Sequence, residues 1–189
     1  PELLSITKAK TMVLRISRNV QKEGNDYGLK DGQIIHGELE NEVIVFTEHG
    51  VKFSANVIYG HKTGYFLDHR NNRKRVGELA KNKTVLDVFS YAGGFSIHAL
   101  AGGATEVTSL DISAQALKIA EANAQLNPHT GKHLTIVGDA FDEMNELAIE
   151  GKEFDIVVID PPSFAKSKPE IEGAIKSYKK LALLGLKLV

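Results

Sequence analysis

Four aspartates each stand at or just beyond the end of a short apolar run in the second half of the chain: Asp87, Asp111, Asp139 and Asp160. Apolar runs that alternate with helical patterns predict a parallel sheet, and ligands bind beyond the carboxyl ends of its strands. Because those ends meet at one edge of the sheet, we expect the four carboxylates to line a single rim. Such a rim favours a ligand that carries positive charge.

The loop after the first run indicates the class of ligand. Its sequence, DVFSYAGGF, has only two adjacent glycines, Gly93 and Gly94, with Asp87 ahead of them. A dinucleotide site uses G-x-G-x-x-G and sets a helix N-terminus against a pyrophosphate. A carboxylate at Asp87 repels a diphosphate and favours a sulfonium or an amine.

The later strand ends add the other parts of a nucleoside site. Asp111 lies 17 residues past Gly94, the region from which an acidic residue holds a ribose diol. Asp139, Ala140 and Phe141 offer an amide and a ring to a purine. Together these residues describe a site for an adenosine without phosphates.

The elements that must position these residues follow from hydrophobic periodicity. Strands are predicted over 85–89, 106–110, 134–137 and 154–159, and helices over 93–101, 113–126, 140–149 and from Ile171 onward. The fold class is therefore α/β, with a Rossmann-like parallel sheet. Ahead of the sheet, a helix is predicted after Asp68, which is placed as its N-cap.

The first sixty residues alternate with period two and predict a small antiparallel meander. Its strands are expected over 11–17, 33–39, 42–48 and 51–58, with a tight turn at His49-Gly50. We therefore divide the chain into a β-rich domain, residues 1–60, and a ligand-binding domain, residues 61–189.

Composition excludes several classes of protein. The 189 residues are 42% hydrophobic and 25% charged, with a net charge of −1, so no global positive field indicates a nucleic-acid partner. No apolar stretch is long enough to cross a membrane, and no signal peptide is present, so a cytoplasmic protein is expected. Cysteine is absent and the seven histidines show no ligand spacing, so no metal site is predicted.

The motif series resembles that of class I S-adenosylmethionine-dependent methyltransferases: VLDVFSYAGGFSIHAL, SLDIS, GDAFD and DIVVIDPPSFAKSK. Within that class, GHKTGYFLDHRNNR ahead of the first motif is similar to the bacterial ribosomal RNA large-subunit methyltransferases, which also carry a β-rich domain before the catalytic domain. The resemblance covers Leu14 to the end of the chain. It implies S-adenosylmethionine as cofactor and RNA as substrate.

The resemblance also implies roles for individual residues. The methionine end of the cofactor would be wrapped by Asp87, Phe89, Ser90, Tyr91, Ala92 and Gly93. Asp111 would bind the ribose, Ile112 would lie against the adenine, and Asp139 with Ala140 would face the adenine edge. Phe66, Asp68 and Arg70 would close the pocket from the N-terminal side. Asp160, Pro161 and Pro162 would border the methyl group and a flipped target base.

The target base stays open between cytosine carbon 5 and guanine N7. Ser163 stands where amino-methylating relatives carry Tyr or Phe, which disfavours methylation of an exocyclic amine. The carbon-5 enzymes attack with a thiolate, which in the members that this chain most resembles comes from a later strand. The resemblance implies a sheet with more than the four parallel strands counted here, so we expect the sheet to be incomplete at its C-terminal end.

Other functions remain as alternatives. One is a nicotinamide-dependent oxidoreductase, and another is a noncatalytic RNA-binding module that retains the fold. Asp87, Asp111 and Asp139 also suit simple helix capping. The basic cluster Arg70, Arg73, Lys74 and Arg75 suits either phosphate contact or a solvated helix face. A homodimer is a further open expectation.

Overall fold

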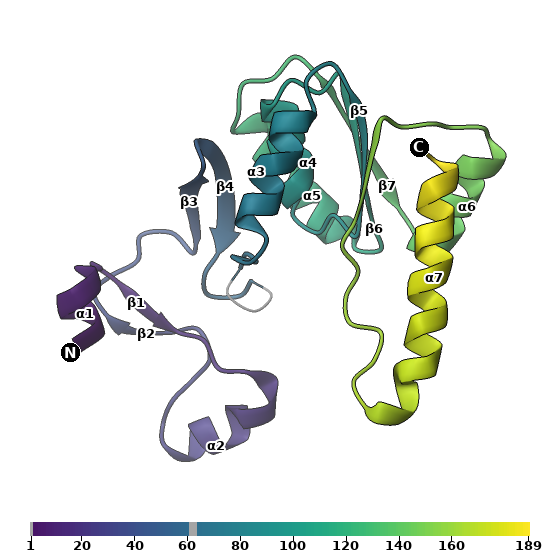
Figure 1. Ribbon diagram of the computed structural model, residues 1–189. Helices are drawn as coiled ribbons and strands as arrows, with labels where there is room; N and C mark the ends of the chain where they lie inside the picture. Colours follow the sequence, from purple (N-terminus) through teal and green to yellow (C-terminus); the bar gives the residue numbers. More distant parts are fainter. Residues whose placement is uncertain (1, 61–63) are drawn as a thin grey trace. The chain divides into compact units, whose positions relative to one another are not determined.

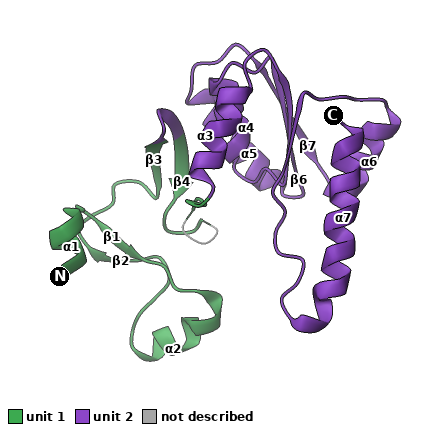
Figure 2. Cartoon of the chain, viewed as in Figure 1, with its two compact units in different colours: residues 1–47, 53–68 green, residues 48–52, 69–189 purple. Residues whose placement is uncertain are grey.

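The computed structural model describes residues 2–60 and 64–189 and divides the chain into two compact units. The first comprises Pro1–Thr47 and Phe53–Asp68, and the second comprises Glu48–Lys52 and His69–Val189 (Figure 2). Three residues of the GHKTGYFLDHRNNR motif, His61, Lys62 and Thr63, lie outside the described residues.

The first unit is built from short elements. In chain order these are α1 (Glu2–Thr7), β1 (Met12–Leu14), η1 (Arg18–Val20), α2 (Gln21–Asp26), β2 (Gln33–His36), β3 (Val43–Glu48) and β4 (Val51–Asn56). Strands β1 and β2 pair antiparallel, and β3 pairs with β4 around the His49-Gly50 turn. This turn and the strand residues next to it, Glu48–Lys52, belong to the second unit. The β-rich character is confirmed.

The single meander expected for this region is wrong in one respect. Strands β2 and β3 do not pair, so the four strands form two separate two-stranded sheets. Gly37 follows β2 with a φ of 72°, a conformation that favours glycine and ends the strand. The period-two pattern indicates strands but does not say which neighbours pair.

The second unit contains the parallel sheet (Figure 1). Its elements are α3 (Arg70–Leu79), β5 (Thr84–Val88), α4 (Gly94–Ala101), β6 (Glu106–Asp111), α5 (Ala114–Gln125), β7 (Lys132–Val137), α6 (Ala140–Ile149), β8 (Ile156–Ile159), η2 (Lys168–Glu170) and α7 (Ile171–Lys187). The strands are parallel in the order β7-β6-β5-β8. The predicted α/β class is confirmed.

The strand order determines which face each helix covers. The chain moves from β5 through β6 to β7 and then returns past β5 to β8. The helices that connect the outward strands therefore lie on the opposite face from the helix that makes the return. Helices α4 and α5 pack on one face, while α6 and α7 cover the other (Figure 1). The core under α6 and α7 comprises Leu86, Val88, Leu110, Ala140, Met144, Leu147, Phe154, Leu181, Leu184 and Leu188.

Helix α3 packs closely on α4. Gly77 of α3 lies so near that a Cβ there would be 2.7 Å from the carbonyl oxygen of His98 in α4, so only glycine fits. The helix begins at Arg70 with His69 as its N-cap, so the expectation that Asp68 caps it is wrong. His69 has a φ of 58°, a left-handed conformation that is uncommon for a residue with a side chain.

A buried charged network joins α3, α4 and the end of β3. The Arg73 guanidinium donates two hydrogen bonds of 2.8 Å to the Glu48 carboxylate, and His98 Nε2 lies 3.0 Å from Glu48 Oε1. All three residues are at most 5% exposed. Burial raises the pKa of Glu48, but its bonds to Arg73 and His98 outweigh this and lower it, while burial lowers the pKa of His98.

This network corrects one interpretation of the basic cluster. Arg73 is neither on a solvated face nor placed to contact phosphate, because its charge is paired inside the second unit. Lys74 and Arg75 on the same helix are exposed and pair with Glu78. A buried pair of this kind is costly to break, since the remaining buried charge loses its counter-charge.

Candidate functional site

The carboxyl ends of the four parallel strands bring the predicted site residues to one edge of the sheet. Asp87 lies in β5, Asp111 ends β6, and Asp139 and Asp160 follow β7 and β8. Backbone hydrogen bonds tie neighbouring ends together, from Gly138 N–H to the Asp111 carbonyl and from Asp160 N–H to the Val88 carbonyl. This edge includes the point at which the chain reverses its direction across the sheet, where open α/β sheets bind ligands.

Asp87 is the most deeply buried of the four aspartates, with 1% of its surface exposed. Its Oδ2 accepts hydrogen bonds from the backbone N–H of Ser96 at 3.0 Å and from the Ser96 hydroxyl at 2.6 Å. Among the residues that the structure describes, its Oδ1 has no partner. The pKa of Asp87 is raised to about 7, mainly by burial. The charges of Asp160 and Asp111 add to this rise, and the hydrogen bonds from Ser96 oppose it.

This pKa predicts a pH dependence of stability that Asp87→Asn removes. The folded pKa of about 7 lies above the ordinary 3.8, so between these values the folded chain holds a proton that the unfolded chain has lost. The free energy of unfolding therefore falls as pH rises through this window, by up to about 4 kcal/mol. Urea unfolding at several pH values measures this contribution as the difference between wild type and Asp87→Asn. A difference that does not change with pH would contradict it.

The loop after β5 has an unusual backbone. Phe89 and Tyr91 have φ values of 65° and 49°, and strained conformations of this kind cluster at functional sites. Gly93 has a φ of 78°, which glycine adopts without strain. The loop is tied to β6, because Ser90 N–H donates to the Leu110 carbonyl and Tyr91 N–H donates to Asp111 Oδ2 at 2.9 Å.

The structure explains why residue 93 is a glycine, apart from its predicted contact with the cofactor. It is the N-cap of α4, and a Cβ at this position would lie 2.9 Å from the Cβ of Ala120 in α5. Ala92 is buried beside it, and its carbonyl accepts a hydrogen bond from the Asn123 side chain. The two residues therefore position the loop whether or not they contact a ligand.

Asp111 binds two backbone groups without using all its acceptor capacity. Oδ2 accepts from Tyr91 N–H and Oδ1 accepts from Ser113 N–H at 2.9 Å. A carboxylate has about four acceptor positions, so each oxygen retains one. Ser113, not Asp111, is the side-chain N-cap of α5. The neighbouring Ile112 is 74% exposed and offers an apolar surface at this edge.

The residues that follow β7, Asp139 and Ala140, have clear structural roles. Asp139 is exposed and caps α6, since its Oδ1 accepts from Phe141 N–H at 2.9 Å. Ala140 is 4% exposed with its side chain in the core, which leaves its backbone as the part able to face a ligand. The capping interpretation of Asp139 is thus confirmed, and it does not exclude ligand contact by the remaining oxygen.

Asp160 and the prolines lie at the open end of β8. Asp160 Oδ1 is 4.0 Å from His69 Nε2, an approach that the sequence did not reveal. Pro162 and Ser163 are exposed, while Pro161 is partly buried. The Ser163 hydroxyl donates to the Ala165 carbonyl at 2.8 Å and so shapes the loop.

An aromatic cluster next to this loop was also missed by sequence reasoning. The ring of Phe164 lies 4.8 Å from Tyr178, 6.1 Å from Phe141 and 6.5 Å from Phe89, measured between centroids. Lys180 Nζ lies 5.0 Å from the Phe141 ring centroid. Phe89 and Phe164 follow β5 and β8, whereas Phe141 lies in α6 and Tyr178 in α7. Because the four rings are far apart in the sequence, no local pattern indicates that they meet.

The residues proposed to close the pocket are divided between the units. Phe66 and Asp68 belong to the first unit, whereas Arg70 is the exposed first residue of α3 in the second. Their assignment to the cofactor therefore stays a prediction that rests on the motif.

The side chains at the edge fit a cationic nucleoside. Asp87 Oδ1 and Ser90 Oγ are buried without a partner in the described part of the chain, and buried polar atoms of this kind call for one. An ammonium or sulfonium group next to Asp87 would supply positive charge, and the free acceptor positions of Asp111 suit two hydroxyls. In the described ranges, no group of three or more His, Asp or Glu is placed to hold a metal ion.

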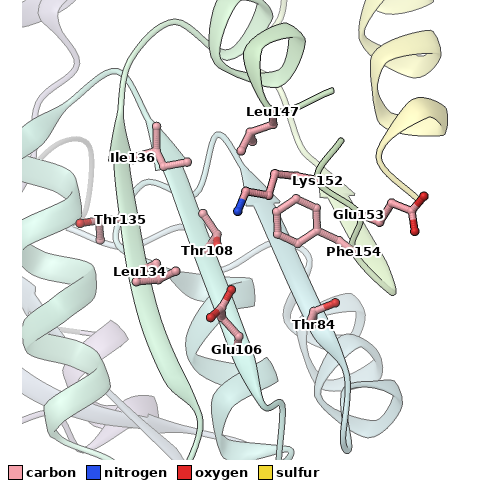
Figure 3. Close-up of a pocket in the computed structure, with 10 residues that line it drawn as sticks. All are labelled: Thr84, Glu106, Thr108, Leu134, Thr135, Ile136, Leu147, Lys152, Glu153 and Phe154. Carbon is pink, nitrogen blue, oxygen red and sulfur yellow. The ribbon is translucent and has the colours of Figure 1, made fainter. Parts of the chain in front are cut away.

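A separate cavity of about 280 Å³ opens elsewhere in the second unit (Figure 3). It reaches Thr84 and Glu106, the first residues of β5 and β6, and is lined also by Leu134, Leu147 and Phe154. None of the predicted site residues lines it. The cavity is therefore not where the predicted ligand is expected to bind.

None of the helices described is long and apolar enough to cross a membrane.

Comparison with known proteins agrees with the geometry. Residues 31–181 match the family described as S-adenosylmethionine-dependent methyltransferase. The chain is 50% identical over 176 residues to a ribosomal RNA large subunit methyltransferase of Deinococcus radiodurans, covering 93% of this chain and 43% of that protein. It is 43% identical over 164 residues to ribosomal RNA large subunit methyltransferase I of Aeromonas salmonicida, covering 86% and 41%.

Among solved structures, the chain is similar to SMU.776, a protein assigned as a methyltransferase and crystallised with SAH (S-adenosylhomocysteine). The TM-score is 0.70 at 32% identity, and the match covers 82% of this chain and 41% of that one. The chain thus spans less than half the length of each of these three proteins.

Proposed function

Because the chain belongs to the family of S-adenosylmethionine-dependent methyltransferases, we propose that its second unit binds S-adenosylmethionine at the carboxyl edge of the sheet. The observation that carries this proposal is Asp87, a buried carboxylate with one oxygen left unpartnered in the described chain. A cation is the natural partner of that oxygen, and a diphosphate is repelled by it.

The proposed roles follow the strand ends. Asp87 and Ser90 hold the methionine end, and the strained loop of residues 89–93 surrounds it. Asp111 accepts from the ribose hydroxyls, with Ile112 against one face of the adenine. Asp139 and the backbone of Ala140 face the adenine edge, next to the Phe141 ring. Phe66, Asp68 and Arg70 remain proposed cofactor-binding residues.

We propose that the activity is methylation of a base in large-subunit ribosomal RNA, as the names of the relatives support. When bound, the cofactor supplies a methyl group on a sulfonium. The protein's part is to orient the target atom in line with that group and to exclude water, and orientation alone lowers the barrier substantially. Asp160 and the rigid Pro161-Pro162 pair shape the slot for a base taken out of its stack.

The target atom is proposed to be cytosine carbon 5 or guanine N7. Ribosomal RNA as a substrate implies a cytoplasmic protein. A homodimer stays a prediction, which the mass of the chain in solution would test.

Transfer of a labelled methyl group tests the proposed substrate. The protein that contains this sequence is incubated with S-adenosylmethionine labelled in the methyl group and with either large- or small-subunit ribosomal RNA. We expect label in the large-subunit RNA, recovered after digestion as 5-methylcytidine or 7-methylguanosine. Label in neither RNA, together with RNA binding that does not depend on the cofactor, would favour the noncatalytic RNA-binding alternative.

A further inference from the structure

A continuous chain of hydrogen bonds runs from Asp87 across the sheet to His133 on the edge strand β7. The Ser96 hydroxyl donates to Asp87 Oδ2 at 2.6 Å and lies 2.6 Å from the hydroxyl of Ser109. The Ser109 hydroxyl lies 2.8 Å from Nε2 of His133. The chain therefore connects the carboxylate at the candidate site with an imidazole two strands away.

The inner residues of this hydrogen-bonded chain are buried. Ser96 and Ser109 are 0% exposed, and Asp87 is 1% exposed, whereas His133 is partly exposed. Ser109 lies opposite Asp87 in the register of β5 and β6, which brings the chain straight across the face covered by α4 and α5. Of these four residues, His133 is thus the one that solvent reaches.

Each serine hydroxyl has one proton, so the direction of every bond in the chain is linked to the next. When Asp87 is ionised, Ser96 donates to Asp87, Ser109 donates to Ser96, and His133 Nε2–H donates to Ser109. When Asp87 carries a proton on Oδ2 and donates it to Ser96, all three bonds reverse. His133 Nε2 then accepts from Ser109, and its proton resides on Nδ1.

Charged groups act on both ends of the hydrogen-bonded chain. Glu121 of α5 and His129 of the loop before β7 act on His133, with opposite signs. Asp111 and Asp160 act on Asp87. Glu121 is also bonded by the Thr135 hydroxyl on the same face of β7 but outside the chain, which makes Thr135 a suitable control position.

We propose that this chain couples the protonation state of the His133 imidazole to the charge of Asp87, and that His133 is therefore a positioning residue for the cationic end of the cofactor. The second part rests on the proposed function. Starting from imidazolium and carboxylate, His133 Nε2 gives its proton to Ser109, Ser109 gives its own to Ser96, and Ser96 gives its own to Asp87. One proton is transferred in total, from His133 to Asp87, and the net charge of the hydrogen-bonded chain is unchanged.

Nitrogen NMR of the ligand-free protein tests the coupling without any cofactor. The seven histidines are labelled with ¹⁵N, and His133→Phe identifies the signals of His133. We expect the protonation of Nε2 to change with pH along with the Asp87 carboxyl signal, and to lose that change in Asp87→Asn. A tautomer that is constant across neutral pH, or a change that persists in Asp87→Asn, would overturn the proposal.

Binding of S-adenosylmethionine across the same pH range tests the role in positioning. We expect His133→Phe to weaken binding by about 3- to 10-fold, the scale of one hydrogen bond, and to move the pH midpoint of the affinity. His133→Gln, whose amide restores a donor, should recover most of the affinity. Thr135→Val, which leaves the hydrogen-bonded chain intact, should leave the affinity unchanged.

These outcomes separate the two proposals. If His133→Phe alters stability but leaves the affinity and its pH midpoint as in wild type, His133 has only a structural role and the positioning proposal is wrong. If wild type does not bind S-adenosylmethionine or SAH at all, the proposed function fails and the positioning role fails with it. The NMR result then decides the coupling alone.

Discussion

Replacing Asp111 with alanine is expected to weaken binding of SAH by at least about 100-fold, or about 2.7 kcal/mol. The carboxylate is proposed to accept from the ribose hydroxyls, and a hydrogen bond to a charged group contributes about 1.5–3 kcal/mol. The same substitution removes the acceptor of Tyr91 N–H and so releases the loop that is proposed to surround the methionine end. Both changes weaken the binding of SAH, and titration calorimetry measures their combined effect on the affinity.

The matched control for this experiment is Glu150→Ala. Glu150 is an exposed carboxylate at the far end of α6 from Asp139, so its removal changes the net charge equally without touching the candidate site. We expect its affinity for SAH to equal that of wild type. If Asp111→Ala binds SAH as well as the control does, the proposed ribose site is wrong.

Replacing Glu48 with glutamine is expected to lower the free energy of unfolding by about 3–5 kcal/mol. The substitution keeps the shape of the side chain but removes its charge, and Arg73, at 4% exposure, then loses the carboxylate to which it is paired at 2.8 Å. His98 also loses a charged acceptor. Urea unfolding followed by circular dichroism gives the change directly.

Glu78→Gln is the control, because Glu78 also pairs with basic residues of α3 but lies at the surface. Its partners Lys74 and Arg75 are more than half exposed, and pairs of this kind contribute about 0–1 kcal/mol. Equal effects of the two substitutions would show that the buried network does not stabilise the second unit.

The parallel sheet was predictable because its signal is local. Strands β5 and β8 are short apolar runs, and each is followed by a turn and a helical pattern, so residue type and order alone indicate them. The pairing of the N-terminal strands was not predictable in the same way. Whether β2 pairs with β3 depends on the chain between them, and period two is the same in either case.

The candidate site was predictable to the extent that strand ends define it. Asp87 and Asp111 were found because parallel strands end at one edge. Ser96, Ser109 and His133 were missed, since their contacts join residues that are 9 to 24 positions apart. Arg73 was misassigned for the same reason: its partner Glu48 is 25 residues away, and no local pattern marks it as buried.

Titration calorimetry of the wild-type chain with SAH and with NADH tests the central claim most directly. Asp87 is a buried carboxylate with an oxygen that has no partner among the described residues. It should accept hydrogen bonds from the amino group of SAH and repel the diphosphate of NADH. The account predicts saturable binding of SAH that S-adenosylmethionine displaces, with no heat from NADH. Binding of NADH without binding of SAH would contradict it.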